Sequence, residues 1–169
     1  MTLFPCYSSY LSSNICVKVL TISPTVGFNI KTLVWGSYKL NIWDIGGQKI
    51  LRGYWRNYFE CTDAIVWTVD LTDCMRVKEC SEALKMLLKE DRLLGTSLLI
   101  LGNKCEVESR MNIEELRKLN NEKIESLELE DIKSHSYNIF EVSGLLGTKL
   151  YEAFKWLIED IEKKKYGRG

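Results

Sequence analysis

The first clear pattern along the chain is a pair of β-rich runs, residues 28–35 and 38–43, in which aromatic and β-branched side chains recur. Only Gly36 and Ser37 separate the two runs, and a glycine at the first central position suits a two-residue type II′ turn. The pattern therefore predicts an antiparallel hairpin.

Three later runs, 64–70, 97–102 and 137–142, are short and apolar without strict alternation, as expected for strands that are covered on both faces. Apolar side chains at helical spacing follow them, and a further helix is expected near Asn112. One stripe is Val77, Cys80, Leu84, Leu87 and Leu88, and the other is Leu150, Ala153, Phe154, Leu157, Ile158 and Ile161. The alternation predicts an α/β domain with a mostly parallel sheet and a ligand crevice at the carboxyl ends of its strands.

The most informative chemistry follows the second arm of the hairpin, in the run Trp43-Asp44-Ile45-Gly46-Gly47-Gln48. A carboxylate at a strand end can lie in the shell of a Mg²⁺ ion, and a glycine N–H can approach a phosphate because no Cβ intervenes. The Gln48 amide can then orient a water molecule. This combination predicts a sensor of a terminal phosphate.

The sequence supplies no phosphate-binding loop ahead of this sensor. Its first glycine is Gly27, so no G-x-x-x-x-G-K-[ST] motif precedes the run, and Lys18 is the only basic residue before position 21. Such a loop provides most contacts to the α- and β-phosphates. We therefore expect this sequence to bind nucleoside triphosphate weakly.

Residues 21–33 and 43–48 resemble the two switch regions of the Arf family of small GTPases, and the resemblance extends to about residue 161. It implies three parts: a divergent segment 1–20, an incomplete small-GTPase domain 21–165 and a tail 166–169. The implied fold is α/β, three-layered and P-loop NTPase-like. It has a mostly parallel sheet and an antiparallel hairpin between the switches, and the first strand and the phosphate loop are absent.

The resemblance also implies roles for individual residues, with GTP or GDP and Mg²⁺ as ligands. Thr25 and Asp44 would bind Mg²⁺, Gly46 and Gly47 would lie at the γ-phosphate, and Gln48 would orient the attacking water. Two short motifs that follow strands would recognise the base of the nucleotide. These are Asn103, Lys104 and Glu106, which resemble N-K-x-D, and Ser143 and Gly144, which resemble S-A-x.

Two of those positions depart from the family pattern. Glu106 carries the carboxylate on a stem one methylene longer than the usual Asp, which puts guanine selectivity in question, and Gly144 stands where the family has Ala.

Three aromatic residues, Phe28, Trp43 and Tyr58, resemble the triad through which switches of this family contact protein effectors. The rival interpretation is core packing, since large aromatic side chains on sheets are commonly buried. Tyr54 and Trp55 add to an aromatic-rich second switch, a composition typical of protein-binding surfaces.

Composition narrows the range of partners and compartments. Lys plus Arg and Asp plus Glu both total 23, so the net charge is zero and no nucleic-acid partner is expected. The six cysteines form no C-x-x-C pair and are expected to be reduced thiols in the cytoplasm. No apolar run approaches a membrane span, and Thr2 in place of glycine gives no N-myristoylation signal at this start.

Three functional hypotheses follow from the sequence: a GTP/GDP switch, a nucleotide-free pseudo-GTPase that binds partners through its aromatic face, and a truncated fragment of the first. By resemblance, the partners would be a tubulin-folding cofactor and carriers of lipidated proteins, in a microtubule-related role. The absent first strand would leave an opening between residues 38–43 and 64–70. Either residues 15–20 fill it as a surrogate strand, or the domain is only marginally stable.

Overall fold

The computed structural model describes residues 24–118 and 135–167 of the chain. The segment 1–20, with the expected surrogate strand at 15–20, lies outside the described residues.

The predicted hairpin is present and is longer than expected. Strand β1 (Phe28–Trp35) pairs antiparallel with β2 (Tyr38–Ile45), and Trp35 faces Tyr38 across the turn. Gly36 has φ +57°, while Ser37 is not among the described residues with positive φ, which fits a type II′ turn. Strand β2 continues two residues beyond the prediction because Asp44 and Ile45 pair with Asn29 and Phe28.

The second sheet is parallel, as predicted, with the order β3 (Ala64–Asp70), β4 (Ser97–Asn103) and β5 (Tyr137–Glu141). The side chains of residues 64–67 and 97–101 are buried, because helices cover both faces of this sheet.

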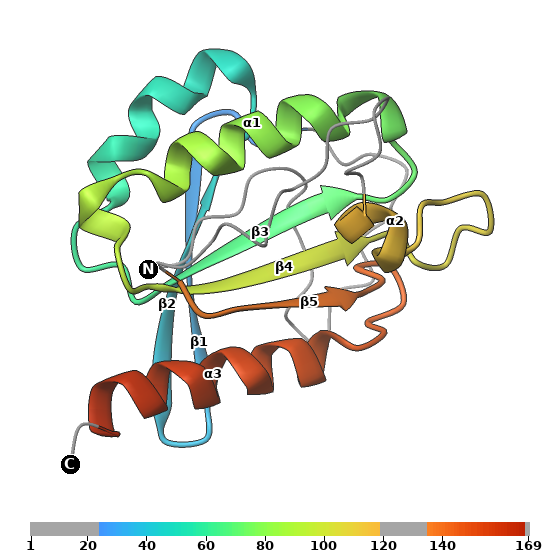
Figure 1. Cartoon of the computed structure of the whole chain (residues 1–169). Helices are drawn as coiled ribbons and strands as arrows, with labels where there is room; N and C mark the ends of the chain where they lie inside the picture. Colours follow the sequence, from blue (N-terminus) through green and yellow to red (C-terminus); the bar gives the residue numbers. More distant parts are fainter. Residues whose placement is uncertain (1–23, 119–134, 168–169) are drawn as a thin grey trace.

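Figure 1 shows these layers: α1 (Val77–Leu88) and the 3-10 helix η2 (Lys49–Tyr58) cover one face, and α3 (Leu150–Tyr166) covers the other. The short elements are η3 (Cys74–Arg76), η4 (Asp91–Leu93) and α2 (Ile113–Lys118). Helix α2 begins directly after Asn112, as predicted. The Asn112 side chain accepts a hydrogen bond from the Glu115 N–H, and the Glu115 carboxylate accepts one from the Asn112 N–H.

Helix η2 has no counterpart among the sequence predictions. Runs of 3-10 helix longer than three or four residues are uncommon, and Gly53 interrupts the segment, so neither length nor propensity indicates this helix.

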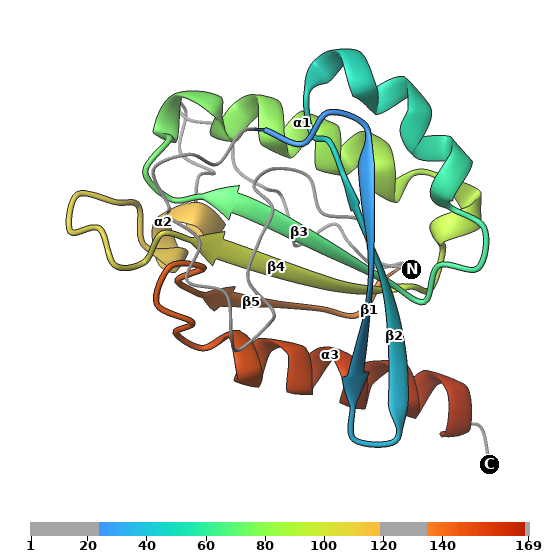
Figure 2. The same cartoon turned by 180° about the vertical axis from the view of Figure 1, so that it is seen from behind.

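The hairpin and the parallel sheet are separate among the described residues, and β2 does not pair with β3. Figures 1 and 2 show the hairpin crossing the start of the parallel sheet and running on past α3, where the rings of Trp35 and Tyr151 stack 4.8 Å apart. At its other end the hairpin contacts η2 through Phe28 and Tyr58. Side-chain packing therefore connects the two sheets.

Candidate functional site

The predicted metal-binding residues lie together at the end of β2. The Thr25 hydroxyl donates a hydrogen bond to Oδ2 of Asp44 at 3.2 Å, and the Asn29 amide donates to the same oxygen at 3.4 Å. Burial raises the pKa of the Asp44 carboxyl, and the hydrogen bonds from Asn29 and Thr25 and the charge of Lys31 offset this only in part. A cation beside Asp44 would favour its ionised form.

The glycine pair that follows is buried and held by its backbone. The Gly46 N–H donates to the Gly27 carbonyl at 2.9 Å, and the Gly46 carbonyl accepts from the Trp55 indole at 3.1 Å. A Cβ at position 46 would collide with the carbonyl oxygen of Thr25 and lie 2.6 Å from Cδ1 of Leu51. This position therefore requires glycine for space.

Gly47 and Gln48 connect the hairpin to η2. The Gly47 carbonyl accepts a hydrogen bond from Nε of Arg52 at 3.2 Å, and Arg52 also forms an ion pair of 2.7 Å with Glu79 of α1. Gln48 precedes the first residue of η2, and its side chain is exposed. Thr25, Gly47 and Gln48 line one cavity, so the structure brings the predicted γ-phosphate residues to one place.

The predicted base-recognition residues also meet, at the carboxyl ends of β4 and β5. The Gly144 N–H donates to Oδ1 of Asn103 at 2.8 Å. Ser143 is buried, and its hydroxyl accepts from the Leu146 N–H at 3.0 Å, which shapes the turn. A Cβ at position 144 would lie 3.4 Å from Oδ1 of Asn103, so alanine also has room there.

Lys104 and Glu106 have different surroundings. Lys104 has φ +69°, and its ammonium lies 2.6 Å from Oδ2 of Asp70. Oε2 of Glu106 is buried and accepts no hydrogen bond from any residue that the structure describes. A buried carboxylate oxygen without a donor is costly, and the N–H groups of a guanine would supply donors there.

The aromatic triad is a single cluster built from β1, β2 and η2. The ring centroids of Phe28, Trp43 and Tyr58 lie 5.4 to 5.6 Å apart in all three pairs. Phe28 is 48% exposed, whereas Trp43 and Tyr58 are half-buried and pack on the core beneath. The cluster therefore has an open face and a core-anchored base.

The expectation that Trp55 contributes to a protein-binding surface is wrong. Trp55 is buried, because its ring packs edge-on against Trp67 with centroids 5.9 Å apart and its N–H is bonded to Gly46. Tyr54 is exposed, as that expectation requires.

Sequence reasoning missed two polar residues of the site, Arg52 and Asp70. Burial raises the pKa of the Asp70 carboxyl, but hydrogen bonds from Lys104 and Thr72 outweigh it and hold the pKa below its usual range. Their ionic partners, Glu79 and Lys104, are remote in sequence, and only the position of Asp70 at the end of an apolar strand could have indicated a role.

Comparison with known proteins identifies the family to which this sequence belongs. The ADP-ribosylation factor family matches residues 11–161 of the sequence. The chain belongs to the Arf family. Family members bind GTP or GDP with Mg²⁺, and small GTPases bind protein effectors.

Two curated Arf-family relatives are similar over most of the chain. ADP-ribosylation factor-like protein 2 of Drosophila melanogaster is 49% identical over 144 residues, which are 85% of this chain and 74% of that protein. ADP-ribosylation factor-like protein 2 of Arabidopsis thaliana is 48% identical over 145 residues, which are 86% of this chain and 75% of that protein.

A solved structure shows the same fold. The Arl6 BBS3 small GTPase from Trypanosoma brucei with bound nucleotide analogue GppNp aligns with a TM-score of 0.77 and 23% identity, covering 96% of this chain and 98% of that chain. In the part of this Arf-family chain that the structure describes, no helix is long and apolar enough to span a membrane.

The described residues fit a guanine base and a hydrated Mg²⁺ ion. Glu106 presents an acceptor without a donor, and Asp44 is a carboxylate whose charge is only partly compensated. No group of three or more His, Cys, Asp or Glu in residues 24–118 and 135–167 forms a metal cluster. Mg²⁺ commonly binds through one or two protein ligands with waters and phosphate oxygens, which suits this pair of Thr25 and Asp44.

Proposed function

We propose that this Arf-family chain is a GTP/GDP switch that recruits protein effectors through the surface formed by Phe28, Trp43 and Tyr58. The packing of these three rings into one partly open cluster is the observation that carries the proposal. Aromatic side chains with a buried base and an exposed face are frequent hot spots of protein interfaces.

The nucleotide-facing residues have separate roles in this proposal. Asn103, Lys104, Glu106, Ser143 and Gly144 would hold the base. Thr25 and Asp44 would bind Mg²⁺, which would neutralise charge on the phosphates. The Gly47 N–H would contact the γ-phosphate. The Gln48 amide is too weak a base to take a proton, so it would orient water, and an arginine from a partner would add much of the rate.

Strand β2 provides the physical connection between the phosphate sensor and the effector surface. Trp43 and Asp44 are consecutive residues, so their side chains point to opposite faces of the strand. Asp44 contacts Thr25 on one face, and Trp43 contacts Phe28 and Tyr58 on the other. A shift of β2 on nucleotide exchange would therefore move the effector surface.

The proposed partners are a tubulin-folding cofactor and carriers of lipidated proteins, in the cytoplasm and in a microtubule-related role. The similarity to ADP-ribosylation factor-like protein 2 from two organisms supports this choice.

A second candidate is a nucleotide-free module that binds the same partners through the same surface. The observation that favours it is the packing of the three rings, which involves no phosphate.

Calorimetric titration of the chain with the tubulin-folding cofactor, with and without excess GTP and Mg²⁺, tests both candidates. The switch predicts tighter binding in the presence of GTP, and the nucleotide-free module predicts equal binding in both conditions. No binding in either condition would contradict the choice of this partner.

A further inference from the structure

An ion pair connects the loop that carries Glu106 to the end of β5. Nη2 of Arg110 lies 3.3 Å from Oε2 of Glu141, and the two side chains are 25% and 23% exposed. The other oxygen of the same carboxylate, Oε1, accepts a hydrogen bond from the Ile113 N–H at 3.1 Å. Glu141 is the last residue of β5 and Ile113 is the first of α2, so one carboxylate joins this strand to the loop and to the helix that follows it.

Backbone hydrogen bonds hold the two ends of this loop, residues 104–112. The Cys105 N–H donates to the Val142 carbonyl at 3.1 Å, and the Met111 N–H donates to the Leu71 carbonyl at 2.9 Å. Glu106 and the Arg110–Glu141 ion pair therefore belong to the part of the loop between these two anchors.

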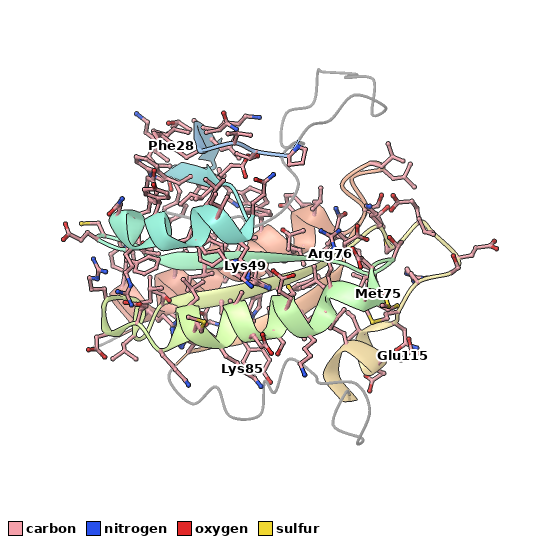
Figure 3. All side chains as sticks on the ribbon, turned by 90° about the horizontal axis from the view of Figure 1, so that it is seen from above. Phe28, Lys49, Met75, Arg76, Lys85 and Glu115 are labelled. Atoms are coloured by element: carbon pink, nitrogen blue, oxygen red, sulfur yellow. The ribbon has the colours of Figure 1, made fainter. Side chains whose placement is uncertain are left out.

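The loop lies at the edge of the molecule where the parallel strands end. Figure 1 shows it in yellow, projecting beyond the sheet between β4 and α2. In Figure 3, Glu115 of α2 lies at the same end of the molecule as Met75 and Arg76 of η3, which follows β3. A projecting loop has few neighbours, so each anchor has a large influence on where Glu106 lies.

Two buried side-chain atoms of this loop have no hydrogen-bond partner among the residues that the structure describes. They are Oε2 of Glu106, an acceptor, and Nε of Arg110, a donor. Both groups act on one thiol: burial raises the pKa of Cys105, the charge of Glu106 raises it further, and the charge of Arg110 lowers it. The unpaired acceptor and the unpaired donor therefore belong to one small region.

The longer side chain at position 106 creates a need for such a neighbour. Glutamate has one more rotatable bond than aspartate, so fixing its carboxylate toward a base costs more conformational entropy. A guanidinium is planar and donates in several directions. Arg110 uses Nη2 for Glu141, and its Nε–H is a second donor on the same rigid group.

We propose that Arg110 is a positioning residue for guanine recognition. Anchored by Glu141, it restrains the Glu106 carboxylate so that this group can accept the N–H groups of the base. The proposal rests on the proposed nucleotide-binding function and adds to it a residue pair outside both base-recognition motifs. The pair would determine how strongly the chain prefers a base with a 2-amino group.

GDP and inosine diphosphate are the probes for the test, because they differ only in the 2-amino group of the base. Calorimetric titration of the full chain at millimolar nucleotide with Mg²⁺ measures both affinities. The unmodified chain should prefer GDP by about tenfold or more, as for a hydrogen bond to a charged acceptor. Arg110→Ala should reduce this preference to about threefold or less, because the carboxylate is no longer restrained.

Arg56→Ala is the matched control, since it also removes one arginine from an ion pair, that of Arg56 with Glu90 at 2.8 Å. Its preference for GDP should equal that of the unmodified chain. Urea denaturation verifies that each variant is folded. If Arg110→Ala does not fold, Glu141→Gln removes the charge of the pair at constant size and should also lower the preference.

A double variant separates positioning from a general loosening of the loop. In the Glu106→Ala background, Arg110→Ala should leave both affinities unchanged, because the carboxylate through which it acts is absent. An equal loss of affinity in the two backgrounds would overturn the proposal and assign Arg110 a purely structural role.

Three further results would also overturn the proposal. A full preference for GDP in both Arg110→Ala and Glu141→Gln would show that the ion pair does not position Glu106. Equal binding of the two nucleotides by the unmodified chain would show that Glu106 does not contact the 2-amino group, although nucleotide binding would stand. Binding of neither nucleotide would contradict the proposed switch function together with this proposal.

Discussion

Gly46 and Gly144 both belong to predicted nucleotide-binding motifs, but a Cβ atom would clash at position 46 and would fit at position 144. Gly46 has the Thr25 carbonyl and a Leu51 methyl where its Cβ would be, whereas Gly144 has only ordinary van der Waals neighbours. Neither has a φ in the left-handed region, so the difference is one of contact alone.

We predict opposite stability changes for alanine at these two sites. Gly46→Ala should lower the free energy of unfolding by about 1–3 kcal/mol through overpacking. Gly144→Ala should raise it by about 0.4–1 kcal/mol, because it restricts the unfolded chain without a clash. Urea denaturation of the two variants measures both, and a loss of stability in Gly144→Ala would show that the turn at Ser143 needs glycine.

Glu106 tests how the base is recognised, because its Oε2 atom has no donor among the described residues. In a chimaera that carries a family phosphate loop, Glu106→Asp should tighten guanine nucleotide binding by about 1–3 kcal/mol, the range for a misplaced charged hydrogen bond. Equal affinity for GDP in the two chimaeras, measured by calorimetry, would show that the longer side chain reaches the base without cost.

Among single residues, the sequence identified those that carry a motif and missed those that act through remote partners. Asp44 and Asn103 lie at the carboxyl ends of β2 and β4 in recognisable runs, and each contacts another predicted site residue, Thr25 and Gly144 respectively. Arg52 contacts Glu79 and Asp70 contacts Lys104, pairs that are separated by 27 and 34 residues and that no local pattern indicates.

Among the secondary-structure elements, strands and α-helices were predictable and η2 was not. Periodicity located β3, α1 and α3 closely, because their apolar residues face a sheet or a helix layer. Helix η2 is held by tertiary contacts such as the Trp55 indole bond to Gly46, which the sequence pattern does not contain.

The bend just before β5 contains a group, His135, that should make stability depend on pH. His135 is buried, and its Nε2 lies 2.9 Å from the Leu93 carbonyl. Burial lowers the pKa of His135, the Leu93 hydrogen bond raises it in part, and the charge of Lys164 lowers it further.

The folded chain therefore binds the His135 proton less readily than the unfolded chain. Stability should be unaffected by this group well above its unfolded pKa of about 6.5 and should fall as the pH drops below that value, by at most about 1.4 kcal/mol per pH unit. Urea denaturation between neutral and mildly acidic pH measures the slope. His135→Gln should flatten it, and an equal slope in the variant would assign the dependence to other groups.

For the whole molecule, the order of elements predicted the layered α/β fold, but the arrangement of the two sheets depends on side-chain packing. The triad joins β1, β2 and η2, and the Trp35–Tyr151 stack joins the hairpin to α3. The sequence predicts neither η2 nor the path of the hairpin past α3. It therefore identified the three triad residues but could not show that their rings are in contact.

The phosphate-loop motif missing from this sequence leads to a prediction about nucleotide content. The purified chain should carry no stoichiometric guanine nucleotide and should be loaded only by excess GTP and Mg²⁺, because each lost charge-assisted hydrogen bond removes about 1.5–3 kcal/mol of binding energy. Chromatography of the acid-released contents measures this. About one GTP or GDP per chain would contradict the prediction and would show that other residues replace the loop.

The most direct test of the effector surface compares the Phe28→Ala variant with the unmodified chain. The quantity measured is the affinity of each for the tubulin-folding cofactor in the calorimetric titration described above. Val34→Ala is the matched control, because Val34 is an exposed apolar residue on the same strand outside the triad. Phe28→Ala should weaken binding by about 2 kcal/mol or more while unfolding stability changes by no more than about 1 kcal/mol, and Val34→Ala should bind normally. Normal binding by Phe28→Ala, or a stability loss of about 3–5 kcal/mol as for a core aromatic, would contradict the proposal that this cluster is the effector surface.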